Sequence, residues 1–569
     1  MIAKQLSQQL LTTALLLALV VIGVSSAPLS AEMGPPIPDD KKIIGFASIV
    51  MSPAYLKEHI AEVERIPFDG LVFTIYGNDW SYRKTGQEHL FFGGHRYQPG
   101  DFSNDLADLK ATKFKQFTDN FILIQTSSRG SITTGDPKDG NLDWFDPAWD
   151  GIVQNGSLVA KLAKDAGFKG IFLDVEDYRG SLGPWKGRHI FDYEVYPYKD
   201  KHTRKEFTAQ LQLRGRQFMQ AVVDAYPDIT IIMIQNTGWG KENQLGFFVR
   251  GMLEAKGQAT LIDGLELGYK KVTRKEFAGL RKTAEGLQPQ EKLFESMQYA
   301  FGLWVDPTPD KFGGWHTDPA DFHKNFYSAK EWENTLYAAL TESDKYVWLY
   351  TWHESVWFTP MVRPIPMANQ CKLCPHEKVP AEYAQAFIDC RKPHDLDWTP
   401  KAMQDRWFYV DGAVLVEGDK ITGNEENLLD NADFEHWGDK ANTPPVAWVL
   451  NGHDPLVRKE EKIVKSGKYS VTLSVAGIQG HTMVQRYLPA SSYAGKYAGK
   501  TITLGAWVRS SHAESAVQIL DFVDGSHTTS TGEAPGDGKW HFVTTTKTIR
   551  PDATGEIVLR ISQWMPFDK

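Results

Sequence analysis

The sequence predicts an α/β fold, a (β/α)₈ barrel followed by an all-β sandwich of the jelly-roll type. Over residues 40–405, apolar strands alternate with amphipathic helices, which is typical of a parallel sheet with helical crossovers. Over residues 427–569 the helical periodicity is gone, and short alternating strands are separated by Gly, Asn and Asp turns. A chain of 569 residues is long enough for two such domains.

Residues 1–31 have the pattern of a secretory signal peptide. Lys4 precedes an apolar stretch that begins at Ala14, and the small residues around Ala27 and Ala31 suit cleavage. The stretch is short for a bilayer span, so an uncleaved anchor is the weaker alternative. We therefore expect a secreted protein, periplasmic or extracellular, that is cleaved near Ala27 or Ala31 and has no membrane association afterwards.

The composition excludes one partner class and suggests another. A formal charge of -9 without a basic stripe disfavours nucleic acid, because phosphate binding needs clustered Lys and Arg. The chain holds 18 Trp and 21 Tyr, whose rings stack on apolar ligand surfaces, sugar rings among them. The alternative is that large domains bury many aromatic side chains.

Eight strands and eight helices are expected in the barrel. The strands are 43–50, 70–76, 121–126, 170–176, 229–235, 264–269, 292–299 and 346–352. The helices are 53–65, 104–119, 157–166, 203–225, 241–255, 274–286, 329–342 and 381–390, with caps at Ser52, Thr203, Thr273 and Ser328. An open doubly wound sheet is disfavoured because no Gly-rich phosphate loop follows the first strand.

Two carboxylates end the fourth strand. In Gly170-Ile-Phe-Leu-Asp174-Val-Glu176, Asp174 and Glu176 are two positions apart, so both face the barrel axis at its mouth. Barrel active sites lie at this end of the strands, and a carboxyl beside a like charge can stay protonated as a general acid. The alternatives are solvated loop carboxylates or a cation site.

Other residues are expected at the same height. Glu354 on strand eight is the preferred second carboxylate, and Glu266 on strand six is the next choice, whereas Glu295 is expected to contact the core. The long loops after the strands carry Trp144, Trp149, Trp185, Trp304 and Trp315. The residues expected to bind substrate are Tyr76, Trp80, Gln235, Asn236, Trp239, Tyr269, Gln298 and Trp352.

The Asp174-x-Glu176 strand, with Tyr269 and Trp352, resembles chitinase-type glycoside hydrolases. The resemblance implies that Glu176 is the acid, that Asp174 positions a substrate acetamido group, and that the two rings line a sugar subsite. The chain departs from the family at Lys169 and Phe172, where upstream acids of the motif would stand. The barrel also resembles, more loosely, uncharacterised bacterial barrels similar to glycoside hydrolases. This second resemblance does not indicate a substrate.

The C-terminal region resembles the jelly-roll carbohydrate-binding modules of families 4, 9 and 22. The residues that carry this resemblance are Asn427-Leu-Leu-Asp-Asn431-Ala-Asp-Phe434-Glu435, Pro445-Val-Ala-Trp448, Gly467-Lys-Tyr-Ser470, Ala506-Trp507-Val and Gly538-Lys-Trp540. The resemblance implies a sugar-binding sandwich over 427–569. Its usual closing Asp-rich strand is not evident at Phe567-Asp568-Lys569, and 406–426 is expected as a linker or β-hairpin.

The three cysteines leave two interpretations open. Cys371 and Cys374 with His376, and Cys390 with His394, have the residue types of a zinc site. A disulfide with one remaining thiol is favoured in an exported protein.

These observations favour a glycoside hydrolase without a cofactor, acting on a poly- or oligosaccharide. A separation of the two carboxyls of about 5–5.5 Å would predict retention, and about 6.5–9.5 Å inversion. One alternative is a non-catalytic carbohydrate-binding protein with a degenerate barrel site. Another is a metal-dependent hydrolase that uses Asp174, Glu176, His353 and Glu354, which is disfavoured because no paired-His motif is present. The sequence does not indicate an oligomeric state.

Overall fold

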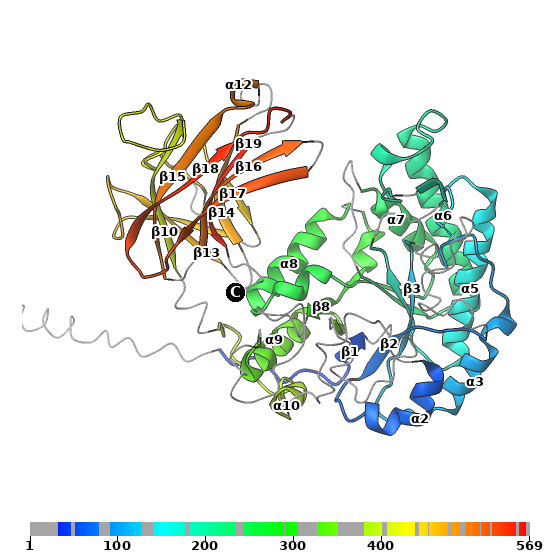
Figure 1. Cartoon of the computed structure of the whole chain (residues 1–569). Helices are drawn as coiled ribbons and strands as arrows, with labels where there is room; N and C mark the ends of the chain where they lie inside the picture. The colour runs from blue at the N-terminus through cyan, green and yellow to red at the C-terminus, as the bar shows by residue number, and fades with distance from the viewer. Residues whose placement is uncertain are drawn as a thin grey trace, which may run out of the picture.

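A parallel sheet curls into a barrel in this computed structural model, and two antiparallel sheets follow it along the chain (Figure 1). The expected leader, 1–31, and the C-terminal residues 565–569 lie outside the described residues. The structure describes residues 32–46, 52–78, 91–127, 140–176, 183–185, 187–234, 243–289, 291–304, 325, 327–350, 381–400, 407–438, 443–452, 455–475, 481–488, 495–511, 514–523, 526–553 and 557–564.

Strands and helices alternate through the barrel. The strands are β1 (Lys42–Phe46), β2 (Gly70–Phe73), β3 (Phe121–Gln125), β4 (Gly170–Asp174), β5 (Thr230–Met233), β6 (Thr260–Asp263), β7 (Gln298–Tyr299), β8 (Phe301–Trp304) and β9 (Tyr346–Tyr350). The α-helices are α2 (Pro53–Val63), α3 (Ser103–Ala111), α5 (Asp150–Asp165), α6 (Arg204–Ala225), α7 (Leu245–Ala255), α8 (Arg274–Leu287), α9 (Ala329–Glu342) and α10 (Ala381–Asp389). Short 3₁₀ helices are η3 (Pro99–Phe102), η5 (Pro147–Trp149), η6 (Gly183–Trp185), η7 (Tyr193–Val195), η8 (Glu266–Lys270) and η9 (Phe294–Ser296).

The predicted helix starts are confirmed by their caps. Each of four side chains accepts a hydrogen bond from a backbone N–H in the first turn of its helix, and these are Ser52, Thr203, Thr273 and Ser328. Such caps satisfy donors that have no partner within the helix.

The barrel closes through a divided strand. The strand order is β7-β6-β5-β4-β3-β2-β1-β9-β8, and only Ala300 separates the two end strands in sequence. Because β7 pairs with β6 and β8 pairs with β9, these two segments together fill one strand position. Counting them as one leaves eight positions, as predicted for a (β/α)₈ barrel.

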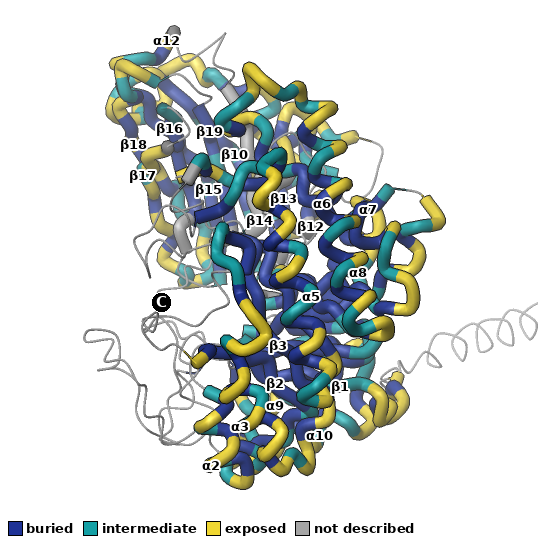
Figure 2. The backbone as a smooth tube through the Cα atoms, turned by 90° about the vertical axis from the view of Figure 1, so that its right-hand side faces the viewer, coloured by how far each residue is buried: buried dark blue, intermediate teal, exposed yellow. Residues whose placement is uncertain are grey.

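Period-two alternation sorts the strand residues between two cores. On β4, Phe172 belongs to the cluster inside the barrel, whereas Ile171 and Leu173 belong to the larger cluster under the helices. Figure 2 shows the barrel strands as buried and the outer sides of the helices as exposed. This parity determines which residues at the strand ends reach the mouth.

The sixth and seventh strands lie elsewhere than predicted. Strand six ends at Asp263, before the predicted range 264–269, most of which forms η8. The apolar residues at alternating positions in 264–269 have the pattern of a strand. The strand itself begins at Thr260, directly after a turn at Gly257, where φ is +52°. Strand seven likewise starts at Gln298, near the end of the predicted range 292–299.

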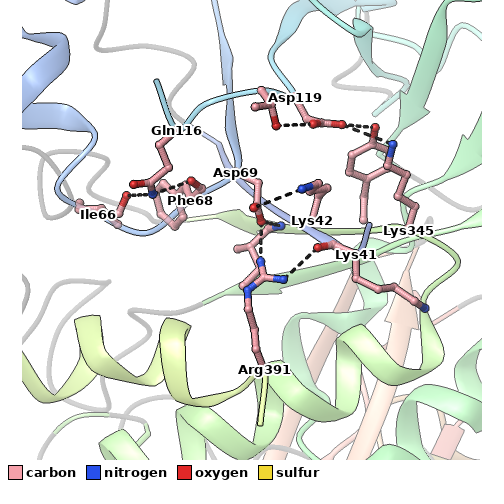
Figure 3. A network of polar contacts seen from close by, with 12 residues as sticks. Lys41, Lys42, Ile66, Phe68, Asp69, Gln116, Asp119, Lys345 and Arg391 are labelled. Atoms are coloured by element: carbon pink, nitrogen blue, oxygen red, sulfur yellow. Dashed lines mark hydrogen bonds and ion pairs between the residues drawn. The ribbon is translucent and has the colours of Figure 1, made fainter. Parts of the chain in front are cut away.

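A polar network closes the end of the barrel where the strands begin (Figure 3). The Asp69 carboxylate accepts hydrogen bonds from the backbone N–H of Ile43 and from the Arg391 guanidinium, both at 2.7 Å. The hydroxyl of Tyr346 donates to Asp119 at 2.8 Å. Charges paired in this way stabilise the fold, and the ends where the strands finish, where barrel active sites are usually found, lie on the other side.

The C-terminal sandwich has two five-stranded antiparallel sheets, as predicted in class. One sheet has the order β12-β13-β10-β15-β18 and the other β11-β14-β19-β16-β17. The elements are β10 (Phe408–Glu417), β11 (Val449–Gly452), β12 (Pro455–Glu460), β13 (Ser470–Val475), β14 (His481–Leu488), α12 (Gly495–Tyr497), β15 (Thr501–Ser510), β16 (Glu514–Val523), β17 (Ser526–Ala534), β18 (Trp540–Thr548) and β19 (Ile557–Trp564).

Within the range 406–426, expected as a linker or hairpin, residues 408–417 form the central strand of the first sheet. β10 pairs with β13 on one side and β15 on the other. Asp411-Gly412 has the composition of a hairpin turn. Here the pairing register shifts between Asp411 and Ala413, so the dipeptide forms a β-bulge, with Gly412 at φ +51°.

Candidate functional site

The end of β4 places one carboxylate on the inner wall of the mouth. Asp174 has the inward parity of Phe172 and is 2% exposed. Its Oδ2 accepts a hydrogen bond of 2.5 Å from Nε2 of Gln125 on β3, and its Oδ1 accepts one of 2.9 Å from the backbone N–H of Glu176. Both oxygens are therefore held, and the carboxylate in turn orients the backbone that carries Glu176.

Glu176 lies two residues after Asp174, just beyond the end of β4. Val175 packs outward in the core under the helices, so Glu176 takes the inward parity, and it is half-buried. Tyr269 lies on η8, which follows β6, and only β5 separates β6 from β4 in the sheet. The pKa of Tyr269 is raised well above its usual value, in order of effect, by burial and by the charges of Glu266, Tyr350, Glu176 and Asp174. The acids from β4 and η8 therefore lie near enough to this phenol for their charges to oppose its ionisation.

Three half-buried rings form a wall beside these acids. Tyr269 and Tyr350 are stacked, with ring centroids 5.5 Å apart, and Trp304 is 6.0 Å from Tyr269 and 5.7 Å from Tyr350. Beneath them the Trp348 indole fills the barrel and donates from Nε1 to the Gly264 carbonyl at 2.8 Å. Aromatic faces of this kind suit the apolar face of a ligand ring.

Trp348 fits only because a neighbouring strand carries glycine. A Cβ added to Gly302 would lie 2.5 Å from Cζ2 of Trp348. Real Cβ contacts are not this short, so a side chain here would displace the indole and the wall above it.

Several buried polar atoms at the mouth have no hydrogen-bond partner among the described residues. They are Oγ1 of Thr74, Oε1 of Gln125, Oγ1 of Thr126 and Oγ of Ser127, which follow or end β2 and β3. Thr74, Gln125 and Ser127 have inward parity, so these atoms can bond water or ligand hydroxyls. These four residues were not predicted, although a polar residue at or directly after the end of an apolar strand is the same signal that indicated Asp174.

Of the two candidates for the second carboxylate, Glu266 is among the described residues and Glu354 is not. Glu266 is half-buried and lies on η8, three positions before Tyr269, rather than on a strand as predicted. Of the predicted ligand-binding residues, Tyr76 is buried where the chain leaves β2. Five further residues of the predicted substrate-binding set lie outside the described residues, as do the preferred second carboxylate, Glu354, and Trp315 and His353; the five are Trp80, Gln235, Asn236, Trp239 and Trp352.

Gln298 and Glu295 lie elsewhere than predicted. Gln298 begins β7, so it lies at the end of the strand opposite the mouth, and its predicted place in the site is wrong. Glu295, expected to contact the core, is exposed on η9. Both errors follow from the displaced seventh strand, whose true C-terminal residue is Trp304.

Three of the five tryptophans expected in the mouth loops are core residues. Trp144, Trp149 and Trp185 are each at most 2% exposed and belong to the cluster under the helices. Nε1 of Trp144 donates to the Ile190 carbonyl at 2.7 Å, and Nε1 of Trp185 donates to the Leu142 carbonyl at 3.0 Å. For these residues the alternative of ordinary burial is correct.

Asp263 is a buried carboxyl that was not predicted from the sequence. It is fully buried, and neither of its carboxyl oxygens has a hydrogen-bond partner among the described residues. Burial raises its pKa well above the usual value. It shares the outward parity of Leu261, so it lies behind the barrel wall and outside the mouth.

Cys390 and His394, the described part of the zinc interpretation, both have hydrogen-bond partners within the fold. Cys390 is a free, buried thiol that donates to the Phe387 carbonyl, and burial raises its pKa to about 12. Both ring nitrogens of His394 are engaged, one with the Lys392 carbonyl at 2.7 Å and one with Glu333 at 2.6 Å. No cluster of three His, Cys, Asp or Glu suited to a metal occurs within the described ranges. Cys371, Cys374 and His376 lie outside them.

Comparisons with known proteins identify no family. No protein-family model and no curated protein sequence matches the chain. Among solved structures it is similar to 3-keto-D-glucoside 4-epimerase YcjR from E. coli, with 13% identity over 62% of this chain and 99% of that chain and a TM-score of 0.30. It is also similar to PbGH5A, a glycoside hydrolase family 5 enzyme from Prevotella bryantii, with 9% identity, coverage of 60% and 86%, and a TM-score of 0.31.

A third similar structure is endonuclease IV from Thermus thermophilus, with 8% identity, coverage of 54% and 92%, and a TM-score of 0.26. These three proteins differ in their named activities, and likeness at such scores says nothing about the activity of this chain. In the part of the chain that is described, no helix has both the length and the apolar character needed to cross a membrane.

Proposed function

We propose that the chain is a glycoside hydrolase that acts on a poly- or oligosaccharide at the barrel mouth, with Glu176 as general acid and base. The observation that carries the proposal is the arrangement at the end of β4. A buried Asp174, held by Gln125, orients the backbone of Glu176, and both acids act on Tyr269 in a wall of aromatic rings. Glycoside hydrolysis requires two carboxyls beside a surface that binds the sugar ring, and Glu176 beside these rings is proposed as the first of the two.

The residues divide the chemistry between them. The protonated Glu176 carboxyl would give its proton to the leaving glycosidic oxygen, and its carboxylate would then take a proton from the attacking water. Asp174 would keep the Glu176 backbone in place, and Tyr269, Trp304 and Tyr350 would bind the apolar face of a sugar ring. Glu354 is the proposed second carboxylate, with Glu266 as the next choice.

Export belongs to the same proposal. Residues 1–31 have the composition of a cleaved leader, and a hydrolase of polymeric glycans needs access to substrates outside the cytoplasm. The expected partner is a glycan alone.

A glycan-array and hydrolysis screen of the mature protein tests the proposal. Glu176→Gln keeps the size of the side chain and removes its acidity. Glu295→Gln is the matched control, because Glu295 is exposed and lies near the beginning of the seventh strand, away from the mouth. We expect at least one hydrolysed glycan, a loss of about 10²–10⁴-fold in Glu176→Gln, and no loss in the control. Equal activity of Glu176→Gln and the native protein on every hydrolysed glycan would contradict it. Glycan binding without any hydrolysis would favour a non-catalytic binding protein.

A further inference from the structure

The side-chain amide of Gln125 lies against the Asp174 carboxylate inside the barrel. Gln125 is the last residue of β3, shares the inward parity of Leu123 and is 8% exposed. Its Nε2 donates to Oδ2 of Asp174 at 2.5 Å, while the backbone N–H of Glu176 donates to Oδ1 at 2.9 Å. Each carboxylate oxygen therefore already accepts a hydrogen bond from an amide of the chain itself.

The hydrogen bond to Asp174 determines which way the Gln125 amide is turned. A carboxylate only accepts hydrogen bonds, so the NH₂ group must face Asp174, and the carbonyl oxygen Oε1 lies on the other side of the amide. This Oε1 is buried and has no hydrogen-bond partner among the described residues. A ligand group that binds beside it must therefore be a donor, such as a hydroxyl.

Two hydroxyl side chains lie near this carbonyl oxygen in the fold. Ser127 is two residues after Gln125, and Thr74 directly follows β2, which lies beside β3 (Figure 1). Both side chains have inward parity and are at most 1% exposed. Oγ of Ser127 and Oγ1 of Thr74 have no partner among the described residues either. The inner wall at β2 and β3 thus offers uncharged groups that suit hydroxyls.

Side chains from outside the barrel hold the ends of these two strands. Asp105 on α3 accepts a hydrogen bond of 2.7 Å from the backbone N–H of Tyr76, just after β2. After β3, the Asn141 side chain donates to the Thr126 carbonyl, and the Thr126 N–H donates to the Asp174 carbonyl, both at 2.8 Å. The polar groups are therefore in place before a ligand binds, which lowers the cost of ordering them.

The charges at the mouth disfavour an acidic sugar. Asp174 and Glu176 both have inward parity, and the inward strand positions within the described ranges carry no Lys or Arg that could pair with a ligand carboxylate. A uronic acid would add a third carboxylate beside these two, and like charges repel. The rings of Tyr269, Trp304 and Tyr350 instead suit the apolar face of a neutral sugar.

The Gln125 amide also disfavours an N-acetylated sugar. It makes the amide hydrogen bond to Asp174 that the chitinase-type resemblance would assign to a ligand acetamido group. A ligand acetamido group would have to displace this buried side chain and break its 2.5 Å hydrogen bond. A sugar hydroxyl is smaller, and it can donate to Oε1 while the amide stays in place.

We propose that the barrel mouth selects a neutral sugar with hydroxyls in place of an acetamido group or a carboxylate, and that Gln125, with Thr74 and Ser127, determines this specificity. The proposal rests on the proposed function for the reaction and names its substrate class. One hydroxyl donates to Oε1 of Gln125, and neighbouring hydroxyls bond to Thr74 and Ser127. The apolar face of the same sugar ring lies against the aromatic wall.

Hydrolysis of matched oligosaccharides by the full mature chain tests the substrate class. The neutral probes are soluble oligomers of glucose, galactose and mannose. Their counterparts are oligomers of N-acetylglucosamine, galacturonic acid and mannuronic acid, whose sugars differ from the neutral ones in one substituent. We expect hydrolysis of at least one neutral probe, and a kcat/KM at least about 10²-fold lower on every counterpart, because a site built for one polar group rejects another strongly.

Two variants test the residues. Gln125→Ala should lower kcat/KM on the neutral probe and reduce the selectivity over N-acetylglucosamine oligomers at least about tenfold, whereas a merely structural role would lower both activities equally. Ser127→Ala should lower kcat/KM on the neutral probe about 5–10-fold, as loss of one hydrogen bond predicts, and it keeps the test valid if Gln125→Ala does not fold. Ser296→Ala is the matched control, because Ser296 is exposed on η9, before the seventh strand.

The outcomes separate this specificity from the hydrolase proposal. Equal or faster hydrolysis of a counterpart would overturn the substrate class and leave the role of Glu176 standing. Native selectivity in a folded Gln125→Ala, or a Ser127→Ala variant as active as the control, would overturn the assignment to these residues. If no probe is hydrolysed, calorimetry with Glu176→Gln decides: preferred binding of a neutral probe, weakened by Ser127→Ala, would support the specificity and count against hydrolysis. Absence of that binding would overturn both proposals.

Discussion

Glu276 should make the stability of the barrel depend on pH. It is the third residue of α8, and its Oε2 accepts hydrogen bonds from the Thr273 N–H at 2.8 Å, the Thr273 hydroxyl at 2.7 Å and the Val272 N–H at 3.1 Å. Its Oε1 is buried without a partner among the described residues, and the residue is 2% exposed. Burial raises the pKa of Glu276 from 4.5 to about 7. This carboxyl joins α8 to the segment that carries Glu266 and Tyr269.

The sign and size of the effect follow from these two pKa values. Between pH 4.5 and about 7 the folded chain holds a proton on Glu276 that the unfolded chain has lost. Stability is therefore greatest at low pH and falls as pH rises through this window. The gap between 4.5 and about 7, at about 1.36 kcal/mol for each pH unit, amounts to about 3 kcal/mol of unfolding free energy.

Glu276→Gln should remove this dependence, because the amide can accept the same hydrogen bonds and does not titrate. The assay is chemical unfolding of the full chain, followed by tryptophan fluorescence, from pH 5 to pH 8. Glu206→Gln is the matched control, because Glu206 forms the same capping box with Thr203 at the start of α6 but is exposed. The control should keep the native slope. Equal slopes for the native protein and Glu276→Gln would refute the reasoning.

Two further substitutions test how the fold supports the site. Gly302→Ala should destabilise the chain by about 1–3 kcal/mol, because the new methyl group overlaps Trp348, whereas Gly279→Ala, with no atom within 4 Å of the new methyl, should not destabilise it. Thermal melts of both variants would check this, and equal melting temperatures would contradict it. Asp69→Ala should cost about 2 kcal/mol in chemical unfolding, because it leaves the Arg391 guanidinium without its 2.7 Å acceptor. A change below about 0.5 kcal/mol would contradict that role.

Period-two alternation explains why part of the barrel could be predicted from sequence. The run from Gly170 to Asp174 is apolar up to a single carboxylate, and every residue of it is buried in a strand. Parity alone then places Asp174 inside and Val175 outside. The same alternation misled the analysis at 264–269, because a 3₁₀ helix with alternating apolar residues has the pattern of a short strand.

The remaining errors have a different physical origin. An indole satisfies its N–H with a backbone carbonyl as readily as it stacks on a ligand, and local sequence does not distinguish Trp144 from Trp304. Asp411-Gly412 has the composition of a turn, but tertiary pairing makes it a bulge inside β10. The hydrogen bond from Gln125 to Asp174 joins residues on neighbouring strands, and no spacing in the sequence signals it.

The most direct test of the central claim compares two leaving groups in the same variant. A natural glycan needs a proton on its departing oxygen, whereas an aryl glycoside with a strongly acidic phenol departs without one. If Glu176 supplies that proton, Glu176→Gln lowers kcat/KM about 10²–10⁴-fold on the glycan and far less on the activated aryl glycoside. An equal loss on both substrates, or no loss on either, would contradict the assignment of Glu176 as the general acid.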